Sequence, residues 1–150
     1  MSMDDQDRLL DIYKLHAELA DRVSQRREGA NRLHVGLYVA LFALLAGFLR
    51  FGFGEAPECL ILGVIGVVGA LLSASWYLII RSYRQLNSEK FRVLHELEER
   101  LPFQFFKSEW DPQLTGGKSN KYLRLTHVET ALPIIFGILF ISLVAYALFQ

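Results

Sequence analysis

Residues 59–80 read CLILGVIGVVGALLSASWYLII and contain no Asp, Glu, Lys or Arg. At about 1.5 Å per residue, a helix of this length extends roughly 33 Å, which is enough to cross the hydrocarbon core of a bilayer. Two further stretches also lack these four residue types: residues 33–49 read LHVGLYVALFALLAGFL, and residues 132–149 read LPIIFGILFISLVAYALF. The sequence therefore predicts an all-α integral membrane protein with three transmembrane helices and a cytoplasmic helical layer.

The composition argues against several other classes of protein. The 150 residues are 52% apolar, which excludes a wholly disordered chain, and too little polar chain remains to cover three such helices in a soluble core. Lys plus Arg and Asp plus Glu number 16 each, so the formal net charge is zero and nucleic acid is not an expected partner. The single cysteine, Cys59, cannot form an internal disulfide or, alone, a cysteine-based metal site.

Basic residues are distributed unevenly among the connections, and this predicts the orientation. Residues 1–32 contain six Lys or Arg, residues 50–58 contain one, residues 81–131 contain nine, and none follows residue 131. By the positive-inside rule, the N-terminus and residues 81–131 are cytoplasmic, whereas the C-terminus is periplasmic. The expected segments are a cytoplasmic amphipathic helix (1–32), a first span (33–50), an outer turn (51–58), a second span (59–80), a cytoplasmic segment (81–131) and a third span (132–149).

The two cytoplasmic segments each carry an apolar stripe at helical spacing. One stripe comprises Leu9, Ile12, Leu19 and Val23, and the other comprises Leu86, Phe91, Leu94 and Leu97. Because neither helix can bury its stripe alone, we expect the two to pack together and to contribute to assembly. No helix breaker occurs between Ile80 and Pro102, so the second span is expected to continue as one helix up to that proline. The charged residues of this extension are expected on a solvated face: Glu89, Lys90, Glu96, Glu98, Glu99 and Arg100.

The rest of the cytoplasmic segment, residues 103–125, is predicted to be irregular. It is dense in aromatic residues, and the neighbouring Gly116 and Gly117 are typical of a mobile loop. Residues 126–129 read THVE and match a capping box, so the last helix is expected to begin there.

Small residues recur at helical spacing in two of the spans. The first span carries Gly36, Ala40, Ala43 and Gly47, and the second carries Gly66, Gly69, Ala70 and Ser73. Small side chains allow helix backbones to approach closely in lipid, so both stripes predict helix packing, either within one chain or between neighbours. Glycine is also simply common in membrane helices, which is the alternative reading.

The remaining polar residues form no recognisable reaction site. No nucleotide-binding loop, nucleophile elbow or zinc-protease helix occurs, so we expect no catalytic, cofactor-binding or metal-binding residues. A proton or metal role for His34 with His127 is a less favoured alternative. Five arginines are expected to lie at the cytoplasmic lipid headgroups: Arg26, Arg27, Arg32, Arg81 and Arg84.

Three stretches carry a resemblance to a known family. They are ELADRVSQRREGANRL (18–33), SWYLIIRSYRQLNSEKFRVLHELEERLPF (75–103) and FFKSEW (105–110), and they resemble the RipA family of small bacterial inner-membrane proteins. That resemblance implies a homo-octamer in the bacterial inner membrane, with a role in envelope maintenance. A weaker similarity is to the SLATT-type two-span modules, which are suspected membrane effectors. Neither resemblance supplies catalytic residues.

Two functions are therefore open. The first is an oligomeric structural or scaffolding protein of the inner membrane with no intrinsic catalysis, whose partners are lipids and further copies of itself; other protein partners are unknown. The alternative is an oligomeric pore or membrane-perturbing effector. The spans lack charged residues and offer mainly aliphatic and small side chains, with the hydroxyls of Ser73, Ser75 and Ser142, so an ion path is not expected in the resting protein.

Overall fold

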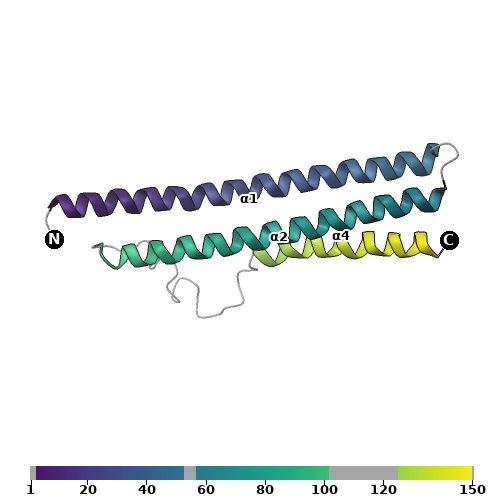
Figure 1. Ribbon diagram of the computed structural model, residues 1–150. Helices are drawn as coiled ribbons and strands as arrows, with labels where there is room; N and C mark the ends of the chain where they lie inside the picture. The colour runs from purple at the N-terminus through teal and green to yellow at the C-terminus, as the bar shows by residue number, and fades with distance from the viewer. Residues whose placement is uncertain (1–2, 53–56, 102–124, 150) are drawn as a thin grey trace. The chain divides into compact units, whose positions relative to one another are not determined.

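The computed structural model describes residues 3–52, 57–101 and 125–149 (Figure 1). It contains three helices, α1 (Met3–Phe51), α2 (Glu58–Glu98) and α4 (Leu125–Leu148), and the described residues form no strand. Each helix is long and apolar enough to cross a membrane. The predicted all-α fold with three spanning helices is confirmed.

Helix α1 is continuous through Gly29, so the expected amphipathic helix and the first span form a single helix. Two ion pairs between residues one turn apart favour the helix: Arg32 with Glu28, which spans Gly29, and Arg22 with Glu18, which precedes it. The helix ends where Gly52 adopts a φ of 68° and its amide donates to the Phe48 carbonyl oxygen at 2.8 Å. Glycine suits this left-handed cap because it has no Cβ to clash there.

Helix α2 runs without interruption from Glu58 to Glu98, as the lack of a helix breaker predicted. In the turn that follows, the amides of Arg100 and Leu101 donate to the carbonyl oxygens of Leu97 and Glu98 at 3.1 and 3.0 Å. Pro102, the expected stop, and the aromatic loop after it lie outside the described residues. Helix α4 begins at Leu125, one residue before the predicted capping box, whose first side chains also lie outside the described set.

The chain divides into two compact units. Unit 1 comprises Met1–Arg27 and Ser82–Leu125, and unit 2 comprises Glu28–Arg81 and Thr126–Gln150. Unit 2 holds all of the three apolar stretches, and unit 1 holds most of the charged residues.

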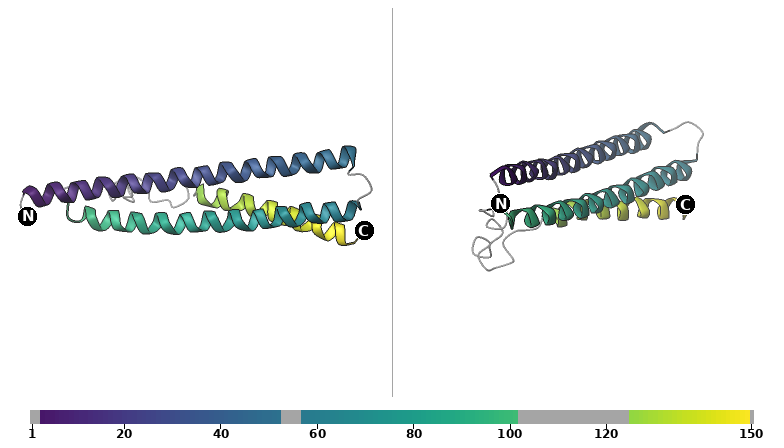
Figure 2. Two further views of the ribbon diagram at one scale, coloured as in Figure 1. Left: turned by 45° about the horizontal axis from the view of Figure 1, so that its top comes forward. Right: turned by 60° about the vertical axis from the view of Figure 1, so that its left-hand side comes forward.

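In unit 2, all three helices contribute to one core. Its buried members are Tyr38 and Leu41 of α1, Ile65, Trp76 and Ile80 of α2, and Phe140 of α4. The ring of Tyr38 lies 4.5 Å from that of Phe136 and 5.8 Å from that of Phe140, centre to centre. Figure 2 shows α4 running alongside the first half of α2. Lipid tails are as apolar as this core, so close van der Waals packing of the aromatic rings, rather than removal from water, holds the three helices together.

In unit 1, the two expected apolar stripes are only partly buried. Leu94 is fully buried and Val23 is 6% exposed, whereas Ile12 and Leu86 remain 47% and 45% exposed. Leu9, Leu19, Phe91 and Leu97 are half-buried. The stripes therefore contribute to the unit 1 core, with Ile12 and Leu86 left on the surface of the single chain.

One sequence prediction about unit 1 is wrong. The sequence predicts that Glu98 lies on a solvated face, yet its side chain has no exposed surface. It follows Leu94 by four residues, which places both on the same face of α2. The charge of the side chain suggested solvent, but its position in the repeat placed it inside.

Candidate functional site

Side chains from α1 and α2 form a polar cluster inside unit 2. The indole Nε1 of Trp76 donates to Oδ1 of Asn31 at 2.9 Å. The hydroxyl of Ser73 donates to the Gly69 carbonyl oxygen at 2.9 Å, so the Tyr38 hydroxyl, 2.6 Å away, donates to Ser73 Oγ. These bonds join α1 to α2 at two levels.

His34 belongs to the same cluster. Its ring stacks on Trp76 with centres 5.5 Å apart and planes inclined by 10°. Its Nδ1 lies 2.8 Å from the Ala30 carbonyl oxygen, which can only accept, so this nitrogen carries a hydrogen. Its Nε2 lies 3.5 Å from the hydroxyl oxygen of Ser75, and that hydroxyl donates to the Leu72 carbonyl oxygen. His34 is thus held within the helix pair.

Sequence reasoning did not connect these residues. Asn31, His34 and Tyr38 follow one another at intervals of three and four, the spacing of one helical face, and this signal could have placed them together. Which α2 side chains they would contact could not be read from either helix alone. The possible pairing of His34 with His127 stays untested, because the His127 side chain lies outside the described residues. Within the described part of the chain, no group of three or more His, Cys, Asp or Glu could hold a metal ion.

The small residues of the second span pack against α4 of the same chain. A Cβ at Gly69 would lie 2.3 Å from a ring carbon of Phe140, and one at Gly66 would lie 2.6 Å from a Val144 methyl carbon. Ser73 is buried beside Gly137, and Ala70 packs against the core. The small residues of the second span therefore form the surface of α2 against which α4 packs.

The small residues of the first span have no such partner. Gly36, Ala40 and Ala43 are exposed and Gly47 is half-buried. A Cβ added at Gly36 or Gly47 would meet no described atom within 4 Å. The two stripes that look alike in sequence therefore have different surroundings in the single chain.

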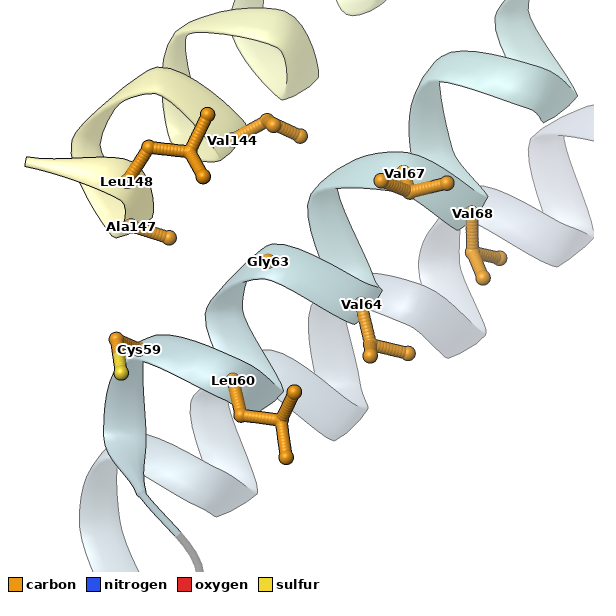
Figure 3. A pocket seen from close by; sticks show the side chains of 9 residues that line it. All are labelled: Cys59, Leu60, Gly63, Val64, Val67, Val68, Val144, Ala147 and Leu148. Atoms are coloured by element: carbon orange, nitrogen blue, oxygen red, sulfur yellow. The ribbon is translucent and has the colours of Figure 1, made fainter.

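An open apolar groove of about 490 Å³ lies between α2 and α4 (Figure 3). Val144, Ala147 and Leu148 form its α4 wall. The α2 wall consists of Cys59, Leu60, Gly63, Val64, Val67 and Val68. Cys59 is a free thiol, and no described charged side chain lines the groove, so the groove suits an apolar occupant.

In unit 1, Glu98 is the centre of a second polar contact. The Tyr13 hydroxyl donates to Glu98 Oε1 at 2.9 Å, and His95 Nδ1 lies 3.6 Å from Oε2. Burial raises the pKa of Tyr13 to about 12, and the hydrogen bond to Glu98 and its negative charge act in the same direction. Tyr13 therefore stays neutral, and remains a donor, throughout the physiological range.

The five arginines predicted to contact headgroups have different surroundings. Arg26, Arg81 and Arg84 are exposed, and Arg27 is half-buried. Arg32 pairs with Glu28 at 2.5 Å. Their contact with lipid remains a prediction.

A comparison with known protein families shows to which family the chain belongs. The model of the octameric membrane protein family matches residues 10–149. The chain belongs to this family. No curated protein and no solved structure matches it. The resemblance to a family of octameric membrane proteins is thereby confirmed at the level of the family, and the chain is an octameric membrane protein. The family is described by its assembly and its location in the membrane, not by a reaction.

Proposed function

We propose that this octameric membrane protein is a structural scaffold of the bacterial inner membrane whose resting assembly does not conduct ions. The proposal rests on one observation: the polar side chains of unit 2 point into the core of a single chain. Asn31, His34, Tyr38, Ser73 and Trp76 are engaged with one another or with backbone carbonyls inside a single chain. They are therefore not free to line a path between subunits.

The outward surface of unit 2 offers little to hydrate an ion. Within the three stretches that lack charged residues, its exposed large side chains are mainly Leu, Val and Ile. Ser142 donates its hydroxyl to the Ile138 carbonyl oxygen of its own helix. Tyr77 and Tyr146 are exposed towards the two ends of the spans, as expected for aromatic residues at membrane interfaces. An axis lined by such a surface would exclude water or fill with lipid, whereas conducting paths expose polar groups.

The proposal places the work of the protein at its cytoplasmic helices and at the membrane surface. Unit 1 carries most of the charged side chains, and no catalytic step is assigned to it. The resemblance stated above supports a link to envelope maintenance. Loss of the protein should then sensitise cells to detergent and osmotic shock, and the full-length chain should restore resistance.

Planar bilayers test the scaffold against the pore. Purified octamer, reconstituted at neutral pH without any added trigger, should give the same baseline current as protein-free bilayers. A known channel reconstituted in the same way is the positive control. Reproducible single-channel steps that depend on the protein would contradict the scaffold proposal and favour the oligomeric pore.

A further inference from the structure

The unpartnered face of α1 in unit 2 has a composition that the single chain does not explain. We call it the glycine face, and it comprises Gly29, Gly36, Ala40, Ala43 and Gly47. At 100° per residue, Gly36 lies 200° from both His34 and Tyr38, and Ala43 lies 200° from Leu41. The glycine face therefore points away from the core that α1 shares with α2 and α4.

Neither backbone geometry nor contacts within the chain require glycine there. Among the described residues, the one positive φ at a glycine is at Gly52, outside this face. A Cβ at Gly29, Gly36 or Gly47 would meet nothing within 4 Å. At Gly36 and Gly47, which lie in the expected span, lipid tails would accommodate leucine equally well, and glycine weakens a helix. What a face of small residues does allow is the close approach of another helix backbone.

The groove between α2 and α4 is a second unpartnered surface, on a different side of unit 2. Leu60, Val64 and Val67 of its α2 wall are 60%, 54% and 48% exposed. By helical position they lie on the side of α2 opposite Ile65 and Trp76, which face the core. The described walls of the groove are apolar, and the groove is deeper at Gly63 because glycine has no side chain (Figure 3).

An octamer inserted in one orientation has cyclic symmetry, because a two-fold axis in the membrane plane would invert half of the subunits. In a ring of this kind each subunit presents two unlike faces to its two neighbours. The glycine face and the groove are two such faces: both are apolar, both are open, and they belong to different sides of the unit. The occupant that the family predicts for them is a second copy of the chain.

We propose that the α1 glycine face of one subunit packs into the α2–α4 groove of the next subunit around the octamer. Cyclic symmetry keeps equivalent residues at the same membrane depth. Within a subunit, Tyr38 lies level with Ser73. Because α1 and α2 are antiparallel, five residues further along α1 brings Ala43 level with residues 67 and 68, in the groove wall.

Disulfide cross-linking of the full chain in membranes tests this pairing. The background variant is Cys59→Ser, since Cys59 lines the groove and is the only native thiol. With Ala43→Cys and Val67→Cys together, mild oxidation should give a ladder of cross-linked species reaching the octamer on a non-reducing gel. The matched control replaces Ala43→Cys by Leu44→Cys, which lies at the same depth, 100° around the helix, and is 57% exposed.

The expected result is about tenfold more cross-linked product for the Ala43 pair than for the Leu44 pair. Equal yields from the two pairs would overturn the proposal, as would no product from the Ala43 pair. Each single-cysteine variant is also oxidised. A strong dimer from Ala43→Cys alone would mean that two glycine faces meet each other, which also overturns the head-to-tail arrangement.

A second variant tests the fit of the interface without cross-linking. Ala43→Leu should dissociate the octamer during size-exclusion chromatography in mild detergent, whereas Val35→Leu should leave it intact. Val35 is 47% exposed and lies off the glycine face. Circular dichroism should show unchanged helix content in both variants. An octamer as stable with Ala43→Leu as with the unmodified chain would contradict close backbone approach at this face.

Discussion

At the scale of single residues, Glu98 is the side chain whose environment matters most for unit 1. Its carboxylate is fully buried and accepts a hydrogen bond from Tyr13, on the other helix of the unit. Burying a carboxylate is costly unless polar partners compensate for lost water. Glu98 therefore joins the two helices of unit 1 through its hydrogen bond with Tyr13, and replacing either residue would break this bond.

We expect Glu98→Ala to destabilise unit 1, because the Tyr13 hydroxyl loses its acceptor and a buried volume is emptied. The expected cost is about 1–3 kcal/mol, measured as a lower midpoint of thermal unfolding in detergent. Glu96→Ala is the matched control, since Glu96 is exposed on the same turn of α2. Leu94→Asp should be worse than either, because it places an unpaired charge at a fully buried position. Equal unfolding midpoints for Glu98→Ala and Glu96→Ala would contradict this role.

At the scale of the helices, the sequence was sufficient for some features and insufficient for others. The three helices follow from the long stretches without charge, and the continuity of α2 follows from the absence of a breaker before Pro102. The buried position of Glu98 follows from the spacing of Phe91, Leu94 and Glu98, but its charge outweighed that spacing in the prediction. The polar cluster around Trp76 depends on the register between α1 and α2, and neither helix encodes that register alone.

The same limit applies to the small-residue stripes. Both stripes predict helix packing. Only the contacts in the structure show that the stripe of the second span packs against α4, whereas the stripe of the first span faces outward. The distinction rests on Phe140, whose ring occupies the space that a Cβ at Gly69 would need. No pattern within α2 indicates which helix supplies that ring.

We expect Gly69→Ala to weaken the docking of α4 on α2. Phe140 is fully buried and has no room to move aside for a new methyl group, which would lie 2.3 Å from its ring. Overpacking of this kind costs about 1–3 kcal/mol. Ala74→Leu is the control on the same helix, because Ala74 is exposed and does not line the groove. The comparison is the rate of proteolysis in mild detergent, and similar rates for the two variants would argue against tight packing at Gly69.

At the scale of the whole molecule, the uneven distribution of basic residues predicts how the chain is oriented in the membrane. The connections carry six, one and nine Lys or Arg in chain order, and the end of the chain carries none. Three helices long enough to span must place the two ends of the chain on opposite sides of a bilayer if all three cross it. The helix count therefore predicts that the two ends lie on opposite sides, and the charge distribution predicts that the N-terminal end is the cytoplasmic one.

Reporter fusions test this orientation directly. Alkaline phosphatase, which is active only in the periplasm, should be active when fused after Gln150 and inactive when inserted between Gly116 and Gly117. A fluorescent protein that folds only in the cytoplasm should give the reverse pattern at the same two positions. The second reporter is needed because low phosphatase activity alone could reflect poor expression. If both positions scored on one side, α4 would not cross the membrane; a reversed pattern would place unit 1 in the periplasm. The reversed pattern would remove the proposed cytoplasmic site of action, whereas the contacts within each unit would stand in both cases.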